Sequence, residues 1–177
     1  MESPDEELML AYGRGDAGAF ETLYARHRGG LFRFVLRQIK DRGLAEELYQ
    51  EVWVRVIEAR ERYAPKARFI TWLYTIAHNL LVDHWRKKGL SLVALDAEDV
   101  PNESANPARQ AEARESLARL LQALEALPAA QREAFLLHQE ADLTVAEIAA
   151  VTGAGEEAAK SRLRYAMAKL KAAVDDD

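Results

Sequence analysis

The chain has 177 residues, 49% of them hydrophobic and 30% charged, so it can bury one modest core or two small ones, which excludes a large multidomain enzyme. It contains no cysteine, which excludes disulfides, thiolate metal sites and a cysteine nucleophile and favours a reducing compartment, the cytoplasm. Its net charge of −5 argues on average against nucleic acid, although the charge is unevenly distributed. No apolar run approaches the roughly 20 residues of a spanning helix, and the acidic start is unlike a signal peptide, so we expect no membrane insertion.

Apolar residues recur at intervals of three and four almost everywhere outside residues 89–107, which predicts an all-α fold. Ser3, Pro4 and Glu6 match a capping box that opens a first helix. Asp16 and Asp41 then occupy capping positions for a second and a third helix.

A fourth helix is expected from about Phe69 to Lys88, ending at Gly89. Four consecutive amphipathic helices predict one bundle over residues 1–90. Residues 91–107 carry four acids, two prolines and no Lys or Arg, which indicates a flexible acidic linker. Fully extended, it could span up to ~60 Å and keep two domains well apart.

A second helical domain is predicted over residues 108–177. It begins with one helix to Leu127 and another from Pro128. Thr144 and Glu147 form a capping box for a short helix, Gly153 makes a turn, and a longer helix covers about 155–174. This spacing is that of a helix-turn-helix. The inward face of the last helix is expected to hold Leu163, Met167, Leu170 and Val174.

Two basic segments stand out in this acidic chain. Residues 55–88 hold eight Lys or Arg against three acids, and residues 160–171 hold five against none. The first segment is also rich in rings, which suit the stacking of unpaired bases, although buried core packing is the simpler reading for Trp53 and Trp72. Its face of Asn79, Asp83 and Arg86 recurs at i, i+4 and i+7, so one side of a helix offers amide, carboxylate and guanidinium together; a purely structural network of the three remains open.

Nothing in the chain matches an enzyme. The four histidines form no i, i+4 pair, and no HExxH motif, phosphate-binding glycine loop or nucleophile elbow occurs. We therefore expect no catalytic residue, no metal site and no cofactor.

Two blocks of sequence resemble the extracytoplasmic-function (ECF) sigma factors of bacterial RNA polymerase, a branch of the sigma-70 family. AEELYQEVWVRV (residues 45–56) looks like the family's polymerase-binding helix, and RFITWLYTIAHNLLVDHWRKK (68–88) looks like its promoter-melting segment. LPAAQREAFLLHQEADLTVAEIAAVTG (127–153) and KSRLRYAMAKLK (160–171) resemble the helix-turn-helix that reads the upstream promoter element. The resemblance implies a sigma-2-like domain, a linker and a sigma-4-like domain.

The resemblance also implies a division of roles. Core polymerase, through its β′ clamp helices and β flap, and promoter DNA would be the partners, with an anti-sigma factor as the family's usual regulator. The residues facing the β′ clamp helices would be Glu46, Glu47, Gln50 and Glu51. The residues holding the −10 element as a melted non-template strand would be Arg62, Lys66, Arg68, Trp72, Asn79, Asp83, Arg86, Lys87 and Lys88. The residues reading the −35 element as duplex would be Glu156, Glu157, Lys160, Ser161, Arg162 and Arg164.

One departure from the family pattern affects the last set. Residues 155–159 read GEEAA where family members usually carry Pro, a small residue and Thr-Val. The threonine hydroxyl is missing, and the paired acids would repel phosphate. Two alternatives stay open: a sigma-like decoy that binds an anti-sigma protein, and a conventional helix-turn-helix transcriptional regulator.

Overall fold

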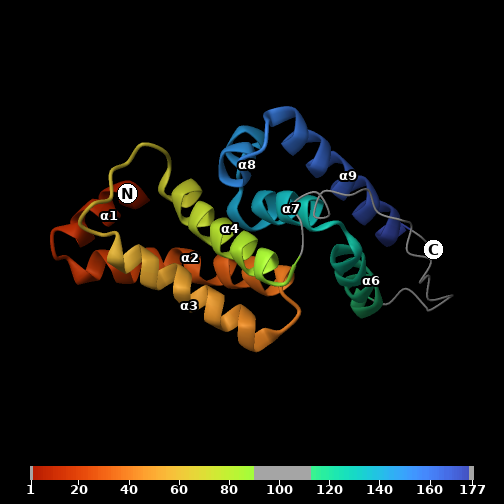
Figure 1. The fold of residues 1–177 in the computed structure, drawn as a ribbon, viewed down its shortest axis with the longest axis horizontal. Helices are drawn as coiled ribbons and strands as arrows, with labels where there is room; N and C mark the ends of the chain where they lie inside the picture. The colour runs from red at the N-terminus through yellow and green to blue at the C-terminus, as the bar shows by residue number, and fades with distance from the viewer. Residues whose placement is uncertain (1, 90–112, 176–177) are drawn as a thin grey trace.

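The computed structural model describes residues 2–89 and 113–175, and every regular element in these two segments is an α-helix. The predicted linker, residues 91–107, and the predicted start of the next helix at 108–112 lie outside the described residues. The helices are α1 (Asp5–Gly13), α2 (Ala17–Gln38), α3 (Arg42–Glu58), α4 (Phe69–Lys87), α6 (Ala113–Ala126), α7 (Ala129–Ala141), α8 (Val145–Thr152) and α9 (Glu156–Asp175). Figure 1 shows α1–α4 gathered into one bundle and α6–α9 into a second.

Side-chain caps begin two helices of the first bundle where the sequence predicts them. The Asp16 carboxylate accepts from the backbone N of Ala19 at 3.3 Å, and the Asp41 carboxylate accepts from the backbone N of Leu44 at 3.2 Å. Each cap satisfies an amide that has no partner within its own helix.

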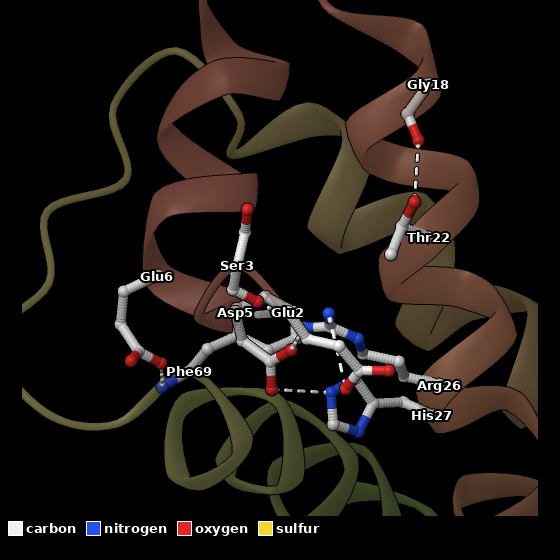
Figure 2. Close-up of polar contacts among 9 residues, drawn as sticks. All are labelled: Glu2, Ser3, Asp5, Glu6, Gly18, Thr22, Arg26, His27 and Phe69. Atoms are coloured by element: carbon white, nitrogen blue, oxygen red, sulfur yellow. Dashed lines mark hydrogen bonds and ion pairs between the residues drawn. The ribbon is translucent and has the colours of Figure 1, made fainter.

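The predicted capping box at Ser3 is wrong. The N-cap residue of α1 is Pro4, and it makes no side-chain cap hydrogen bond. Glu6 instead accepts from the backbone N of Phe69 at 2.7 Å, as Figure 2 shows. The physical reason lies in α4, whose N-cap residue, Arg68, has no acceptor to offer the first amides of that helix. Glu6 therefore caps α4 and ties α1 to it.

Asp5 fastens α1 to α2. One carboxylate oxygen lies 2.9 Å from Nη1 of Arg26 and the other 2.7 Å from Nε2 of His27, both drawn in Figure 2. Burial alone would raise the pKa of Asp5, but the hydrogen bonds and charges of His27 and Arg26 outweigh it and hold the pKa below its ordinary value. The carboxylate therefore stays ionised and keeps both contacts at neutral pH.

Large apolar side chains fill the first bundle. Leu23, Phe34, Phe69 and Leu73 are fully buried, and Phe34 meets Tyr74 edge to face at a ring separation of 5.2 Å. Such aromatic pairs add ~0.5 to 1.5 kcal/mol beyond their buried area. The bundle is thus a rigid support for the outward faces of α3 and α4.

The inward face of α9 matches the predicted one only in part, since Leu170 is buried and Leu163 is half-buried against the core. Ala159, Ala166 and Leu170 are buried, whereas Met167 and Val174 are 47% and 39% exposed. Because α9 packs against α6, α7 and α8, small alanines at the contact let the helix backbones approach closely, and Met167 and Val174 are turned outward.

The two domains are packed together, although the linker is long enough to separate them. Helix α2 lies against α7 and α4 lies against α8, as Figure 1 shows. The buried apolar side chains of both domains join in one cluster. The structure is therefore a closed arrangement.

Candidate nucleic-acid interface

The face of α4 that the sequence singles out is formed as predicted. Asn79, Asp83 and Arg86 are exposed and line the same cleft. Lys87 extends the polar surface, and its Nζ lies 3.4 Å from Oδ2 of Asp83. An amide, a carboxylate and a guanidinium on one wall can hydrogen-bond the exposed edges of unpaired bases.

A cluster of rings lies at the start of α4. Trp72 packs against Tyr63 at 5.0 Å and against Phe69 at 5.7 Å between ring centroids. Tyr63 and Phe69 are buried, but Trp72 is half-buried and can still offer part of its face. Trp53 and Trp85 are buried core residues. The sequence therefore overstates the number of rings that are available for stacking on bases. Trp72 is the best candidate among them.

The loop between α3 and α4 presents exposed cations beside these rings. Arg62 and Lys66 are exposed, as is Lys88 at the far end of α4. Arg68 is exposed on one side, but its Nε lies 3.0 Å from Oε2 of Glu147 in the other domain. One member of the predicted −10 set is thus already held by a carboxylate.

The helix-turn-helix is present and its capping box is confirmed. Thr144 accepts from the backbone N of Glu147 at 3.2 Å, and Glu147 accepts from the backbone N of Thr144 at 3.1 Å. Helix α8 ends at Thr152, and the φ of its C-cap residue, Gly153, is 72°, in the left-handed region that favours glycine. This turn sets the direction of α9.

The first turns of α9 carry the residues predicted to read duplex DNA. Four of them are exposed, Glu156, Glu157, Lys160 and Arg164, and Ser161 is half-buried. The guanidinium of Arg164 lies 5.3 Å from the ring centroid of Tyr165, which restrains it over an aromatic face. Arg162 is half-buried and lines the interdomain cleft.

This cleft brings parts of both predicted DNA surfaces together. It has a volume of about 650 Å³ and is lined by Asn79, Asp83 and Arg86 on one wall. Residues 152–154 of the turn and Arg162 line the other wall. The sequence places these residues in separate surfaces, and nothing in either motif indicates that they meet.

The acidic face of α3 is exposed as expected for a contact surface. Glu46, Glu47 and Gln50 are exposed and Glu51 is half-buried. Glu46 lies 3.3 Å from Nε of Arg42, and Glu51 lies 3.3 Å from Nε of Arg55, both as i, i+4 pairs. Because exposed pairs of this kind contribute little, the carboxylates can exchange partners at low cost.

Sequence reasoning missed a set of glutamates that join the two domains. Glu133, Glu140 and Glu147 are spaced by seven residues. Each meets a basic side chain of the first domain: Glu133 with His78, Glu140 with Arg33, and Glu147 with Arg68. The spacing of seven was the available signal, but their partners are far away in the sequence.

The contacts of Glu147 lower the pKa of its carboxyl group. Burial alone would raise its pKa, but hydrogen bonds from Thr144 and Thr71 and the charge of Arg68 hold the pKa below its ordinary value.

On α4, burial and the neighbouring Lys88 and Lys87 lower the pKa of His84. The end of α4 carries His84, Arg86 and Lys87 in its last turn, followed by Lys88.

Residues 2–89 and 113–175 contain no cluster of three or more His, Cys, Asp or Glu that could hold a metal ion. Over the same part of the chain, no helix is both long and apolar enough to cross a membrane.

Two family models match the chain in the order of its domains: Sigma-70 region 2 over residues 23–90 and Sigma-70 region 4 over residues 117–170. The chain is 37% identical over 166 residues to RNA polymerase sigma factor CarQ of Myxococcus xanthus, covering 92% of this chain and 93% of that protein. It is 30% identical over 171 residues to ECF RNA polymerase sigma factor SigC of Mycobacterium tuberculosis (strain CDC 1551 / Oshkosh), covering 96% and 91%.

The fold agrees with these matches. The solved structure of CnrH in complex with the cytosolic domain of CnrY is similar at a TM-score of 0.70, with 27% identity and 98% of each chain covered. Fold and sequence together define a transcription initiation factor of the sigma-70 type. More narrowly, the chain belongs to the ECF group of RNA polymerase sigma factors, as the two sequence blocks predicted.

Proposed function

We propose that the two domains of this sigma factor divide promoter recognition between them. Residues 1–90 bind core polymerase and grip the −10 element as an unpaired strand, residues 91–107 connect the domains, and residues 108–177 read the −35 element as duplex. The observation that carries this proposal is the single face of Asn79, Asp83 and Arg86 beside a half-buried Trp72, on a different domain from the helix-turn-helix.

Strand opening follows from differential binding. Amide, carboxylate and guanidinium groups on α4 can pair with base edges only after the bases leave the duplex, and Trp72 can stack only on an unpaired base. Arg62, Lys66 and Lys88 add phosphate contacts. Since these contacts are made to the open state alone, they shift the equilibrium towards it. No covalent step is required, and we infer that the chain is not an enzyme.

The acidic face of α3 supports the contact with polymerase. Glu46, Glu47 and Gln50 are exposed on one helix of a rigid bundle, where they can meet basic groups of the β′ clamp helices. We place the β flap contact on the second domain. The chain must act in the compartment that holds core polymerase and the promoter. We propose that this compartment is the cytoplasm.

A dedicated regulatory partner is also part of the proposal. CnrH was solved with the cytosolic domain of CnrY bound to it. By analogy, we propose that an anti-sigma factor binds this chain.

Reconstituted transcription tests the proposal. Core polymerase from a bacterium that carries this chain is mixed with the purified protein and sheared genomic DNA, and the 5′ ends of the RNA are sequenced. We expect start sites that share two upstream elements and are absent with core alone. A decoy would yield no such starts, and a conventional regulator would act only when another sigma factor is added.

A further inference from the structure

Helix α1 holds both ends of the loop that joins α3 to α4, residues 59–68. Figure 1 shows this α3–α4 loop passing beside α1. At the end of the loop, the backbone N of Phe69 donates to Oε2 of Glu6 at 2.7 Å, as Figure 2 shows. At its start, Gly13 lies so close to the backbone of Arg60 that an added Cβ would overlap the carbonyl oxygen. One helix therefore fixes the separation of the two loop ends.

Further contacts fix the start of the loop. The guanidinium of Arg60 lies 6.0 Å from the ring centroid of Tyr12 on α1, and its Nη1 donates to the carbonyl oxygen of Ile57 at 2.8 Å. Arg60 is therefore tied both to α1 and to the last turn of α3.

Helix α1 is itself firmly placed on the rest of the first domain. Met9 is fully buried in the core, and Asp5 bonds to Arg26 and His27 of α2. The ring of His27 in turn packs on Phe69, at 5.5 Å between ring centroids. The bond from Glu6 to α4 therefore starts from a rigid part of the bundle.

The loop carries one ring into this contact region. Tyr63 is 9% exposed and packs against Phe69 and Trp72, with ring centroids 6.2 and 5.0 Å apart. Burial and the nearby charges of Glu6 and Asp5 raise the pKa of Tyr63 to about 12, so its phenol stays neutral here. Trp72, the proposed stacking residue, therefore rests on one ring of the loop and one ring of α4.

We propose that α1 positions the α3–α4 loop and Trp72 to receive the unpaired −10 strand, and that Glu6 is the positioning residue through which it acts. The inference rests on the proposed function, because it holds only if the loop binds the strand. Arg62, Lys66 and Arg68 of the proposed −10 set lie in this loop. A loop that is ordered before binding loses less conformational freedom when the strand arrives, so it binds more tightly than a loose one.

Loss of the Glu6 bond should affect the strand selectively. The proposed polymerase contacts lie on α3 and the proposed duplex contacts on α9, and neither set includes a residue of α1 or of the loop. Phe69 and Leu73 are fully buried, so the core still anchors α4 when the bond is removed. We therefore expect the loop to loosen without unfolding of the domain.

Three variants isolate the Glu6 bond. Glu6→Ala removes the acceptor, whereas Glu6→Gln keeps an oxygen that can accept from the backbone N of Phe69. Glu7→Ala is the matched control, because it removes an exposed acid from the same turn of α1. Hydrogen exchange of the full chain, followed by mass spectrometry of fragments covering residues 59–69, reports the order of the loop.

Three titrations separate positioning from general destabilisation. They measure affinity for core polymerase, for a duplex carrying only the −35 element, and for a fluorescent single strand carrying the non-template −10 sequence. The two DNA titrations use the holoenzyme and promoters found by mapping RNA 5′ ends. A variant that merely folded less well would lose all three activities in proportion.

We expect Glu6→Ala to speed exchange in the loop and to weaken binding of the single strand about fivefold, the usual effect of one lost cap bond. Its affinities for core and for the duplex should be unchanged. Glu6→Gln should lie closer to wild type than to Glu6→Ala, and Glu7→Ala should match wild type.

Gly13→Ala tests the other end of the loop. The new Cβ meets the backbone of Arg60, which cannot rotate aside as a flexible side chain can, so the start of the loop must shift while the Glu6 bond remains. We expect the same selective loss of strand affinity. Wild-type exchange and strand affinity in this variant would overturn the role of α1 at the start of the loop.

Unchanged exchange in Glu6→Ala would overturn the fixing of the loop by α1. Faster exchange with unchanged strand affinity would overturn the positioning role, and a proportional loss of all three affinities would reduce Glu6 to a structural residue. If the wild-type holoenzyme bound no single strand, the proposed function and the positioning role would both fall. Hydrogen exchange would still decide whether α1 fixes the loop.

Discussion

Glu147 bonds to Arg68 across the domain boundary while it caps its own helix. Its Oε2 lies 3.0 Å from Nε of Arg68, and its Oε1 accepts from the backbone N of Thr144 at 3.1 Å. One carboxylate therefore serves local structure with one oxygen and domain docking with the other. This division lets the two roles be separated by substitution.

Replacing Glu147 by Gln should weaken the docking and spare the cap, because the amide oxygen can still accept from Thr144. The Arg68 side chain is half exposed, so we expect the free energy of unfolding to fall by less than about 1 kcal/mol. Glu147→Ala also removes the cap bond and should cost ~0.5 to 2 kcal/mol more. Urea unfolding measures both. Equal losses for the two variants would mean that the cap bond contributes nothing.

Asp5 should make the first domain sensitive to acid. Its folded pKa is depressed, so its contribution to stability is complete above its ordinary pKa of 3.8 and is lost as pH falls through the lower folded value. Asp5→Asn should therefore reduce the free energy of unfolding at pH 7, and the difference from wild type should shrink below pH 3.8.

The control for this prediction is Glu7→Gln, which removes an exposed acid from the same turn of α1. Urea unfolding of the three proteins between pH 7 and pH 2 provides the comparison. A gap between wild type and Asp5→Asn that persists at pH 2 would show that packing, rather than ionisation, anchors α1.

Gly30 and its neighbour Gly29 offer a matched pair within α2. Leucine at either position improves helix propensity by up to ~1 kcal/mol. At Gly29 the new Cβ meets only the end of the Arg33 side chain, at 3.2 Å, which can move aside. At Gly30 it meets the backbone of α7. We expect Gly30→Leu to enlarge the radius of gyration in small-angle scattering, and Gly29→Leu, which disturbs only the end of the Arg33 side chain in its pair with Glu140, to enlarge it less.

The helix caps show which contacts can be predicted from the sequence. Caps at Asp16, Asp41 and Thr144 were predictable because each bond spans three residues and depends on local backbone geometry alone. The one mistaken cap, at Glu6, failed because its true partner, Phe69, is 63 residues away. Rules based on neighbouring residues cannot identify a hydrogen-bond partner so far away in the sequence.

Part of the candidate site could also be predicted from the sequence. The shared face of Asn79, Asp83 and Arg86 follows from helical spacing, and the helix-turn-helix follows from its turn. The docking glutamates could not be found this way, since Arg33 and Glu140 are 107 residues apart. The polar side chains at such an interface also look like an ordinary solvated face in the sequence.

The proposed division of roles predicts opposite defects for two substitutions. Arg162→Ala should weaken binding of the holoenzyme to duplex promoter DNA by ~1 to 3 kcal/mol, because a side chain at the start of α9 contacts the closed duplex. Asn79→Ala should leave this binding intact and impair opening, because its amide meets bases only after they are unpaired. Promoters found by mapping RNA 5′ ends supply the DNA.

Gel shift at low temperature measures the first step, and permanganate reactivity of unpaired thymines measures the second. A template with mismatched −10 base pairs sharpens the contrast, because the cost of melting is already removed. On it, Arg162→Ala should keep its full defect, whereas Asn79→Ala should recover the part of its defect that arises from melting. If both variants lost duplex binding and opening in the same proportion, the two helices would act as one surface and the division would be wrong.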